Sequence, residues 1–327
     1  MSNAFAQVDL DELRRDAADF DRAVAVTPGI DRFCSASAWV LAADAALMGE
    51  RTPWIWRRDD GWLATAKATR PGGRYVEPLE LAWGLACPIV GADPAALIDD
   101  LLAVAAADHD WDALLLAGMG ATSRQAWAVR RGLRPGWRLG RGPATSRFVA
   151  SLDGGVDGFL ARRSRNFRKA MRADQRTAAA RGVTFEDVAV TPASAQAGLD
   201  RILAIERTSW KGLAGAGIDQ GAMRTFYEHM IGPLAAQGAA RLLVARLDER
   251  DVAFIFGGVF AGEYRGLQFS YDAELRALGL GNLGQLAQIA RLVEEGVLTY
   301  DLGTAMEYKE RWAEIVVETT LLVVARH

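Results

Sequence analysis

The sequence has few of the residues that build disulfide frameworks, metal sites or membrane spans. Its only two cysteines, Cys34 and Cys87, lie far apart, which fits a reducing cytosol and provides no disulfide framework. Its three histidines, His109, His229 and His327, are too few and too scattered for a metal site. No apolar run approaches the ~18 residues needed to cross a bilayer, and the polar N-terminus has no signal-peptide core. We therefore expect a cytoplasmic protein without a metal and without membrane attachment.

Several catalytic motifs are also missing. No C-x-x-C, H-E-x-x-H or G-x-S-x-G string occurs, which disfavours metal-dependent hydrolysis and elbow-type serine hydrolysis. The net charge of −3 provides no global basic field for nucleic acid, so we expect none as a partner. Half of the 327 residues are hydrophobic and 24% are charged, which suits two domains of ordinary size. We expect a monomer or homodimer that acts on a small molecule.

One stretch near the C-terminus, residues 267–309, predicts a strand, a glycine-rich loop, a helix, a second strand and a short helix. Its glycines are Gly279, Gly281 and Gly284, and no acidic residue stands at the helix start. Glycine permits positive φ and close approach of a ligand, and free N–H groups at a helix start favour an anion. The pattern predicts a phosphate or pyrophosphate site, and a plain glycine-rich turn is the alternative.

The same letters also satisfy the dinucleotide pattern G-x-G-x-x-G, with Asp301 following at a suitable distance. That fold needs its first glycine tight against the end of the first strand. Residues 272–278 intervene here, and fewer than 50 residues remain to build a parallel sheet. NAD binding is therefore disfavoured.

Four strings resemble a known family. Arg276-Ala-Leu-Gly279-Leu-Gly281 is similar to R-x-x-G-x-G, the acyl-CoA pyrophosphate loop of GNAT-type N-acyltransferases. The string G-T-x-x-x-Y-K-x-x-W resembles the C-terminal signature of the GNAT branch of cellulose-biosynthesis acetyltransferase-like proteins, which are related to Fem-type peptidyltransferases; its residues are Gly303, Thr304, Tyr308, Lys309 and Trp312. The other two strings are the basic segment 162–172 and an E-x-x-S-W-K string formed by Glu206, Ser209, Trp210 and Lys211. The resemblance covers residues 150–327 well and the first half only in layout.

The resemblance implies an α/β (α+β) fold of tandem GNAT-like halves, each a mixed, mostly antiparallel sheet flanked by helices. Residues 1–152 would be a half without a cofactor loop, forming a scaffold or substrate wall, and residues 153–327 the acyl-CoA-binding catalytic half. Residues 87–118 repeat the loop–helix–strand layout of the second half. In this first copy Asp93-Pro94 stands at the helix start, where the carboxylate satisfies the N–H groups and repels phosphate.

The remaining elements follow from periodicity and turn residues. We expect helices at 9–22, 36–48 (capped by Ser35 or Ser37), 123–132, 157–181, 193–211 and 222–236, a hairpin of 54–58 with 62–68, a strand near 145–152, an antiparallel meander of 241–247, 252–260 and 264–271, and a final apolar strand. Helix 157–181 is strongly basic. It is interpreted either as a solvated face or as a landing surface for an acidic partner such as the CoA 3′-phosphate, an acidic substrate or RNA.

N-acyl transfer needs a held cofactor, a neutral amine, a donor for the developing oxyanion and an acid for the departing thiolate. By resemblance, the oxyanion donor is a backbone N–H at the end of strand 264–271. The cofactor-binding candidates are Phe269, Ser270, Tyr271, Arg276, Gly279, Leu280, Gly281, Asn282, Leu283 and Gly284. The catalytic candidates are Tyr308 as the acid and Asp272, Glu206, Glu307 or Asp301 as the base, and the substrate-binding candidates are Trp210, Lys211, Arg168 and Lys309. A packed tyrosine with a structural role is the alternative for Tyr308.

Asp301 lies within an apolar strand, where an unpaired carboxylate would be costly, so we expect Lys309 or Arg311 to pair with it. The leading functional hypothesis is transfer of an acyl group, such as acetyl, from acetyl-CoA or another acyl-CoA to an amine of a small molecule or amino-sugar-like acceptor. The alternatives are a Fem-like aminoacyl-tRNA-dependent transferase and a non-catalytic acyl-CoA-binding or scaffold protein.

Overall fold

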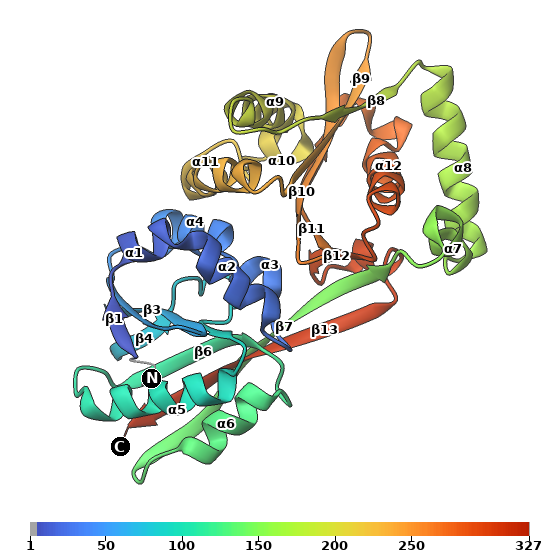
Figure 1. The fold of residues 1–327 in the computed structure, drawn as a ribbon. Coiled ribbons are helices and arrows are strands. Elements are labelled where there is room, and N and C mark those ends of the chain that lie inside the picture. Colours follow the sequence, from blue (N-terminus) through green and yellow to red (C-terminus); the bar gives the residue numbers. More distant parts are fainter. Residues whose placement is uncertain (1–4, 327) are drawn as a thin grey trace. The chain divides into compact units, whose positions relative to one another are not determined.

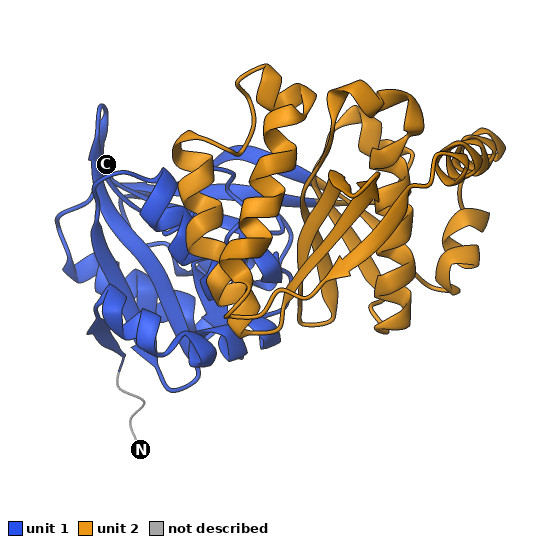
Figure 2. Cartoon of the chain, turned by 90° about the horizontal axis from the view of Figure 1, so that it is seen from above, with its two compact units in different colours: residues 1–146, 318–327 blue, residues 147–317 orange. Residues whose placement is uncertain are grey.

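The computed structural model describes residues 5–326, so His327 lies outside the described residues. The chain divides into two compact units (Figure 2): unit 1 is Met1–Ser146 with Glu318–His327, and unit 2 is Arg147–Val317. The boundary predicted at residues 152 and 153 lies close to this division. The C-terminal segment differs from that prediction, because it belongs to unit 1, where its strand pairs with a strand of the first half. The roles assigned to the two halves stay a prediction.

Unit 1 is built on a mostly antiparallel sheet. Its strands are β1 (Ala6–Val8), β2 (Thr52–Arg58), β3 (Gly61–Arg70), β4 (Gly73–Pro78), β5 (Ile89–Gly91), β6 (Ala113–Met119), the first part of β7 (Trp137–Ser151) and the last part of β13 (Ile315–Arg326). The order is β1-β2-β3-β4-β6-β13-β7, with β5 beside β3. One pair, β4 and β6, is parallel and is connected through a helix. The predicted hairpin is β2 and β3 and is confirmed.

Six helices flank this sheet among the described residues: α1 (Leu10–Arg15), α2 (Ala17–Val26), α3 (Arg32–Ser35), α4 (Ser37–Leu47), α5 (Pro94–Ala107) and α6 (Arg124–Gly132). In Figure 1, α1–α4 lie over one face of the unit 1 sheet and α5 and α6 over the other. The predicted Ala-rich buried helix is α4, but its predicted serine cap is wrong. Ser37 is already the first helical residue and its hydroxyl donates to Asp21, while the Ser35 hydroxyl donates to the Asp31 carbonyl.

The start of α5 confirms the predicted cap. Asp93 is its N-cap and accepts a hydrogen bond from the Ala96 N–H at 3.2 Å, and Pro94 is the first helical residue. A side-chain carboxylate therefore already satisfies this helix terminus.

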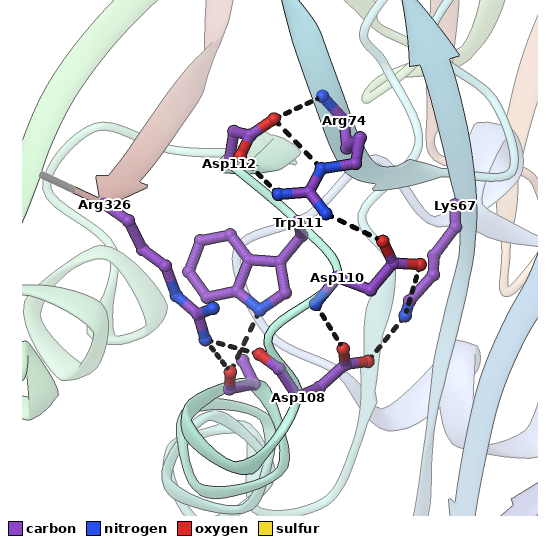
Figure 3. Close-up of polar contacts among 8 residues, drawn as sticks. Lys67, Arg74, Asp108, Asp110, Trp111, Asp112 and Arg326 are labelled. Atoms are coloured by element: carbon purple, nitrogen blue, oxygen red, sulfur yellow. Dashed lines mark hydrogen bonds and ion pairs between the residues drawn. The ribbon is translucent and has the colours of Figure 1, made fainter.

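A polar cluster ties the C-terminal strand to the turn between α5 and β6 (Figure 3). The Arg326 guanidinium lies 3.9 Å from the centroid of the buried Trp111 ring and donates to the carbonyls of Ala105 and Asp108. The Trp111 indole N–H also donates to Ala105, at 2.9 Å. Next to it, Lys67 pairs with Asp108 at 2.6 Å. These contacts hold the last strand of the chain in unit 1.

The strands of unit 2 are also mostly antiparallel and continue the same strand order, as β7-β12-β11-β10-β9-β8. Its strands are the end of β7, β8 (Thr184–Val188), β9 (Ala240–Leu247), β10 (Arg250–Phe260), β11 (Glu263–Tyr271) and β12 (Thr299–Thr304). The predicted meander is β9, β10 and β11 and is confirmed. As in unit 1, a single parallel pair, here β11 with β12, is connected through a helix. The two units therefore share a layout, and the predicted fold class is confirmed.

The helices of unit 2 are α7 (Gly155–Ala161), α8 (Arg165–Ala180), α9 (Ala195–Thr208), α10 (Trp210–Leu213), α11 (Gly221–Ala236), the 3₁₀ helix η1 (Ala273–Leu278), α12 (Leu280–Glu294) and α13 (Glu307–Glu310). In Figure 1, α9 and α11 lie over one face of this sheet and α12 over the other. The predicted single basic helix is two helices, because Ser164 caps a new start by accepting from the Phe167 N–H. Phe159 of α7 and Phe167 and Met171 of α8 are buried in one apolar cluster with Trp312. No described helix is long and apolar enough to cross a membrane.

The Arg326 contacts predict a stability change. Arg326→Ala removes a cation–π contact and two charge-assisted hydrogen bonds, so we expect the free energy of unfolding to fall by about 1–3 kcal/mol. Urea unfolding followed by tryptophan fluorescence measures this change. The control is Arg138→Ala, an exposed arginine of unit 1 for which we expect little change. Equal unfolding midpoints for Arg326→Ala and wild type would show that the cluster does not stabilise unit 1.

Candidate functional site

The parallel strands β11 and β12 pair only over a short stretch. The register joins Glu263, Tyr264 and Arg265 to Thr299, Tyr300 and Asp301, and no pairing follows along the remainder of β11. Where this pairing ends, the register between β10 and β11 shifts. Leu267 is the extra residue, because Phe256 pairs with Gln268 while Gly257 pairs with Gly266. Such a bulge leaves one residue outside the ladder, so backbone groups at the end of β11 become available for other partners.

The helix α12 begins directly after this strand end and η1. Gly279 is its N-cap, with φ of +66°, and no side chain caps it. The first two N–H groups of the helix, those of Leu280 and Gly281, precede the first intrahelical bond, which the Asn282 N–H makes to Gly279 at 3.0 Å. This terminus therefore presents free donors, unlike the capped start of α5.

The predicted glycine-rich loop is partly wrong, because Gly281 and Gly284 lie inside α12. A Cβ on Gly281 would come within 3.1 Å of the Phe269 ring, and one on Gly284 would meet Ile255 at 3.9 Å. Gly281 therefore lets the first turn of α12 pack closely on the rings of β11, whereas a Cβ on Gly284 would make only ordinary van der Waals contact. Only Gly279 needs its positive φ, which a left-handed cap position requires.

The fold brings an acidic side chain to this helix start, although none stands there in the sequence. A Cβ on Gly279 would lie 2.5 Å from the Asp174 carboxyl carbon, and Asp174 comes from α8. The Asn282 side chain donates to Asp174 at 3.2 Å and accepts from Arg311 at 3.0 Å. Arg276, at the end of η1, is exposed. The start of α12 thus has the Arg311 guanidinium and the Asp174 carboxylate near it, and Arg276 precedes Gly279 by three residues in the chain.

The other predicted cofactor-binding residues differ in burial and in the groups that they could present to a ligand. Leu280 and Leu283 are buried in the core, so only their backbones can face a ligand. Ser270 is buried, and its hydroxyl has no hydrogen-bond partner among the described residues. Phe269 and Tyr271 both face the first turn of α12 through their rings.

Lys211 and Glu206 form a largely buried ion pair next to β11. The Lys211 ammonium donates to the Phe269 carbonyl and to the Gln268 side chain, each at 3.0 Å, and lies 3.4 Å from the Glu206 carboxylate. Glu206 is fully buried and also accepts from the Ile218 N–H at 3.2 Å. Desolvation lowers the pKa of Lys211, and the charge of Glu206 opposes this shift. Lys211 binds the carbonyl of Phe269, and Glu206 holds Lys211 in place. The two residues therefore position the backbone of β11.

Asp301 is buried between two guanidinium groups at the point where β11 and β12 separate. It accepts from Arg147 of β7 and from Arg265 of β11, the latter at 3.0 Å, and from the Gly303 N–H at 2.7 Å. The predicted pairing with Lys309 or Arg311 is therefore wrong. Arg265 points inward from the neighbouring strand, and Arg311 bonds Asn282 instead. Lys309 receives only a longer-range influence of the Asp301 charge.

Tyr308 and Lys309 follow β12 and lie on α13. The Tyr308 ring meets the Phe269 ring edge-on at 6.0 Å, and its side chain is 38% exposed. Partial burial raises the pKa of Tyr308 to about 12. The Lys309 ammonium donates to the Thr304 carbonyl at 2.8 Å. Desolvation lowers the pKa of Lys309 to about 8, against the opposing charge of Asp301 and with a further lowering by Arg265.

The remaining predicted residues lie in different surroundings. Asp272 caps η1 by accepting from the Glu274 N–H at 3.0 Å. Arg168 donates to the last carbonyls of α7, including that of Leu160 at 3.3 Å, so it serves as a helix cap. Glu307 is exposed, and Trp210 is 59% exposed at the start of α10. Within the part of the chain that the structure describes, no group of residues could hold a metal ion.

Sequence reasoning missed Asp174 and Arg265 as contributors and the bulge at Leu267. Asp174 stands out as an acidic residue within a basic helix. Arg265 was detectable as a charge within a strand that alternates inward and outward. The bulge had no signal, because its cause is the pairing of β10 with β11.

A comparison with protein-family models matches residues 165–310 to the acetyltransferase (GNAT) domain. This segment contains the sheet of unit 2 from β8 to β12, together with α8–α12. Residues 165–310 therefore match a GNAT-type domain, which confirms the resemblance inferred from the sequence. A comparison with curated proteins found no match.

Solved structures share the fold over nearly the whole chain. A conserved protein of unknown function from Bacteroides thetaiotaomicron has a TM-score of 0.64 at 12% identity and covers 98% of this chain and 99% of its own. FemX also has a TM-score of 0.64 at 12% identity, with coverages of 93% and 95%. The C-terminal domain of a putative lysylphosphatidylglycerol synthetase from Agrobacterium fabrum has a TM-score of 0.56 at 16% identity, with coverages of 94% and 92%. At these identities the likeness concerns the fold alone.

The burial of Lys309 predicts that its amine titrates at a lower pH than an ordinary lysine. With only four lysines in the chain, ¹³C-methylation of the amines and NMR can follow each group separately. We expect the resonance that disappears in Lys309→Arg to titrate near pH 8, well below the ~10.4 of an ordinary lysine. Lys169→Arg, which removes an exposed lysine, is the control for the assignment.

The same shift makes folding pH-dependent. Between about pH 8 and the ordinary lysine pKa of about 10.4, the folded chain binds fewer protons at Lys309 than the unfolded chain. The contribution of Lys309 to stability therefore rises with pH across that window, and Lys309→Met removes this rise. An ordinary titration above pH 10 would contradict both expectations.

Proposed function

We propose that this protein, whose residues 165–310 carry a GNAT-type domain, transfers an acyl group from an acyl-CoA such as acetyl-CoA to an amine of a small molecule or amino-sugar-like acceptor. The observation that carries the proposal is the uncapped start of α12 directly behind the end of β11, where β11 no longer pairs with β12. The N–H groups at the start of α12 would then bind an anionic cofactor, and a backbone N–H of β11 would bind the oxygen of the reacting carbonyl.

The start of α12 has donors and positive charges that suit a pyrophosphate, and one carboxylate, Asp174, that opposes it. The free N–H groups of Leu280 and Gly281 would hold it, and Arg276 and Arg311 would supply positive charge. Asp174 opposes binding, but its carboxylate is engaged by the Asn282 amide. When bound, acyl-CoA supplies a thioester as the activated acyl donor.

The chain's own groups supply proton transfer and positioning. Lys309, with a pKa near 8, is a better proton donor to a leaving thiolate than Tyr308, whose pKa is near 12. We therefore assign the role of general acid to Lys309. Tyr308 packs against Phe269 and has a structural role. Of the four carboxylates considered as a base, Glu307 is exposed, whereas Asp301, Glu206 and Asp272 are held by the structural contacts described above.

The acceptor side is proposed to lie near α10. Trp210 presents an exposed indole there, and the neighbouring Lys211 holds the Phe269 carbonyl. A flat ring of this kind suits the apolar face of a small ring or sugar. The part of β11 that follows the bulge at Leu267, where the ladder is interrupted, would offer the backbone donor for the oxyanion.

The charges at α12 predict opposite effects on CoA binding. Asp174→Asn removes a like charge and should tighten binding about threefold or more, because one charge at this range contributes about 1 kcal/mol. Arg311→Ala should weaken binding by a similar factor. Calorimetric titration with CoA measures both, and Asp157→Asn, an exposed acid on α7, is the control. Unchanged affinity in both variants would remove the pyrophosphate assignment.

The pKa values predict different effects on turnover. Lys309→Met should lower kcat by about 10²-fold, the lower range for loss of a general acid, with CoA affinity nearly unchanged. Tyr308→Phe keeps the ring and should lower kcat less than about tenfold. The assay follows release of CoA with a panel of amines. A larger loss in Tyr308→Phe than in Lys309→Met would make Tyr308 the acid, and transfer only from aminoacyl-tRNA would replace the proposed donor.

A further inference from the structure

Unit 1 contains a hollow of about 210 Å³ between α6 and the neighbouring strands β7 and β13. Its apolar floor includes Leu139 of β7 and Leu322 of β13, and its polar and aromatic lining includes Trp127 and Arg130 of α6 and Arg141 of β7. All of these residues belong to unit 1, so the hollow is separate from the acyl-transfer site of unit 2.

The two charged residues that line this hollow, Arg130 and Arg141, are both basic. Residues 113–152 contain seven arginines and no aspartate, glutamate or lysine, in a chain whose net charge is −3. Other arginines of unit 1 are used in ion pairs, such as Arg58 with Asp100 and Arg74 with Asp112. Arg130 and Arg141 have no acidic partner among the described residues, and both are exposed. Their positive charge is therefore available to an anion from solution.

The aromatic part of the lining is also open. Trp127 is 60% exposed, and the Arg130 guanidinium carbon lies 5.2 Å from its ring centroid. A flat indole with a guanidinium over it is a surface on which planar rings stack, and the guanidinium can bind a phosphate in the same place. The volume of about 210 Å³ lies below the ~300 Å³ of pockets for larger ligands, so one ring with its phosphate fits better than a long chain.

We propose that this α6–β7 hollow binds a small phosphorylated ligand with a flat ring, that is, a ligand of the mononucleotide class. Arg130 and Arg141 bind the phosphate, Trp127 stacks on the ring, and Leu139 and Leu322 cover its apolar edge. The end of a single-stranded nucleic acid carries the same groups. The small hollow and the acidic charge of the chain favour the free ligand.

The test titrates AMP, adenosine and inorganic phosphate into the full chain by calorimetry. The Arg130→Ala/Arg141→Ala variant should bind AMP at least about tenfold more weakly than wild type, the size expected from loss of charge-assisted bonds. The matched control Arg134→Ala/Arg138→Ala removes the same charge from exposed arginines of the same segment that do not line the hollow. It should bind like wild type. Adenosine and phosphate alone should each bind more weakly than AMP, and added salt should weaken AMP binding.

A second variant separates this hollow from the proposed cofactor site. Arg276→Ala/Arg311→Ala changes only residues near α12, so AMP binding in the hollow should persist in it. The proposal is overturned by the absence of AMP binding to wild type, by equal loss in the two arginine pairs of unit 1, or by loss only in the α12 variant. Binding of a single-stranded RNA hexamer that depends on Arg130 and Arg141, without AMP binding, also overturns it and assigns the hollow to RNA.

Discussion

The geometry of unit 2 depends on one buried carboxylate. Asp301 of β12 is bound by guanidinium groups from β7 and β11, so three strands are joined at the point where β11 and β12 stop pairing. A strand that leaves its neighbour would otherwise expose unpaired backbone groups and fray. Two buried arginines also need this charge, because removing one partner of a buried ion pair leaves the others uncompensated, at about 3–5 kcal/mol. The separation of the strands is thus held by electrostatics within the core.

The charge of Asp301 also acts on the pKa of Lys309, the proposed acid. Desolvation favours the neutral amine, while Asp301 favours the ammonium and Arg265 opposes it, so the pKa of Lys309 depends on a balance among buried charges. The start of α12 shows a similar balance, because Asp174 and Arg311 bind opposite ends of the Asn282 amide. In both places a structural ion pair or hydrogen bond sets the electrostatics of a group to which we assign a role in the proposed site.

The sequence predicted most of the secondary structure and the resemblance, because strands, caps and turns are local signals. The Asp93 cap, the hairpin β2–β3 and the meander β9–β11 follow directly from adjacent residues. The errors concern contacts between distant segments. Asp301 was assigned a partner close in sequence, whereas its partners lie on neighbouring strands, and the acid-free helix start receives Asp174 from α8. Likewise, Gly281 is explained by a ring of β11 that only the packed sheet brings against it.

The two units share one layout but differ at the start of the crossover helix. In unit 1 the crossover helix α5 carries its own carboxylate at Asp93, so its terminus is already satisfied. In unit 2 the equivalent helix α12 starts at Gly279 without a side-chain cap, and a charge from another helix stands beside it. A glycine in place of a hydrogen-bonding side-chain cap leaves the N–H groups of the helix start free for the proposed ligand, and neighbouring segments then set the charge beside them. The proposed anion binding at α12 would therefore depend on the packing of α8, since Asp174 opposes an anion as long as α8 holds it against Gly279.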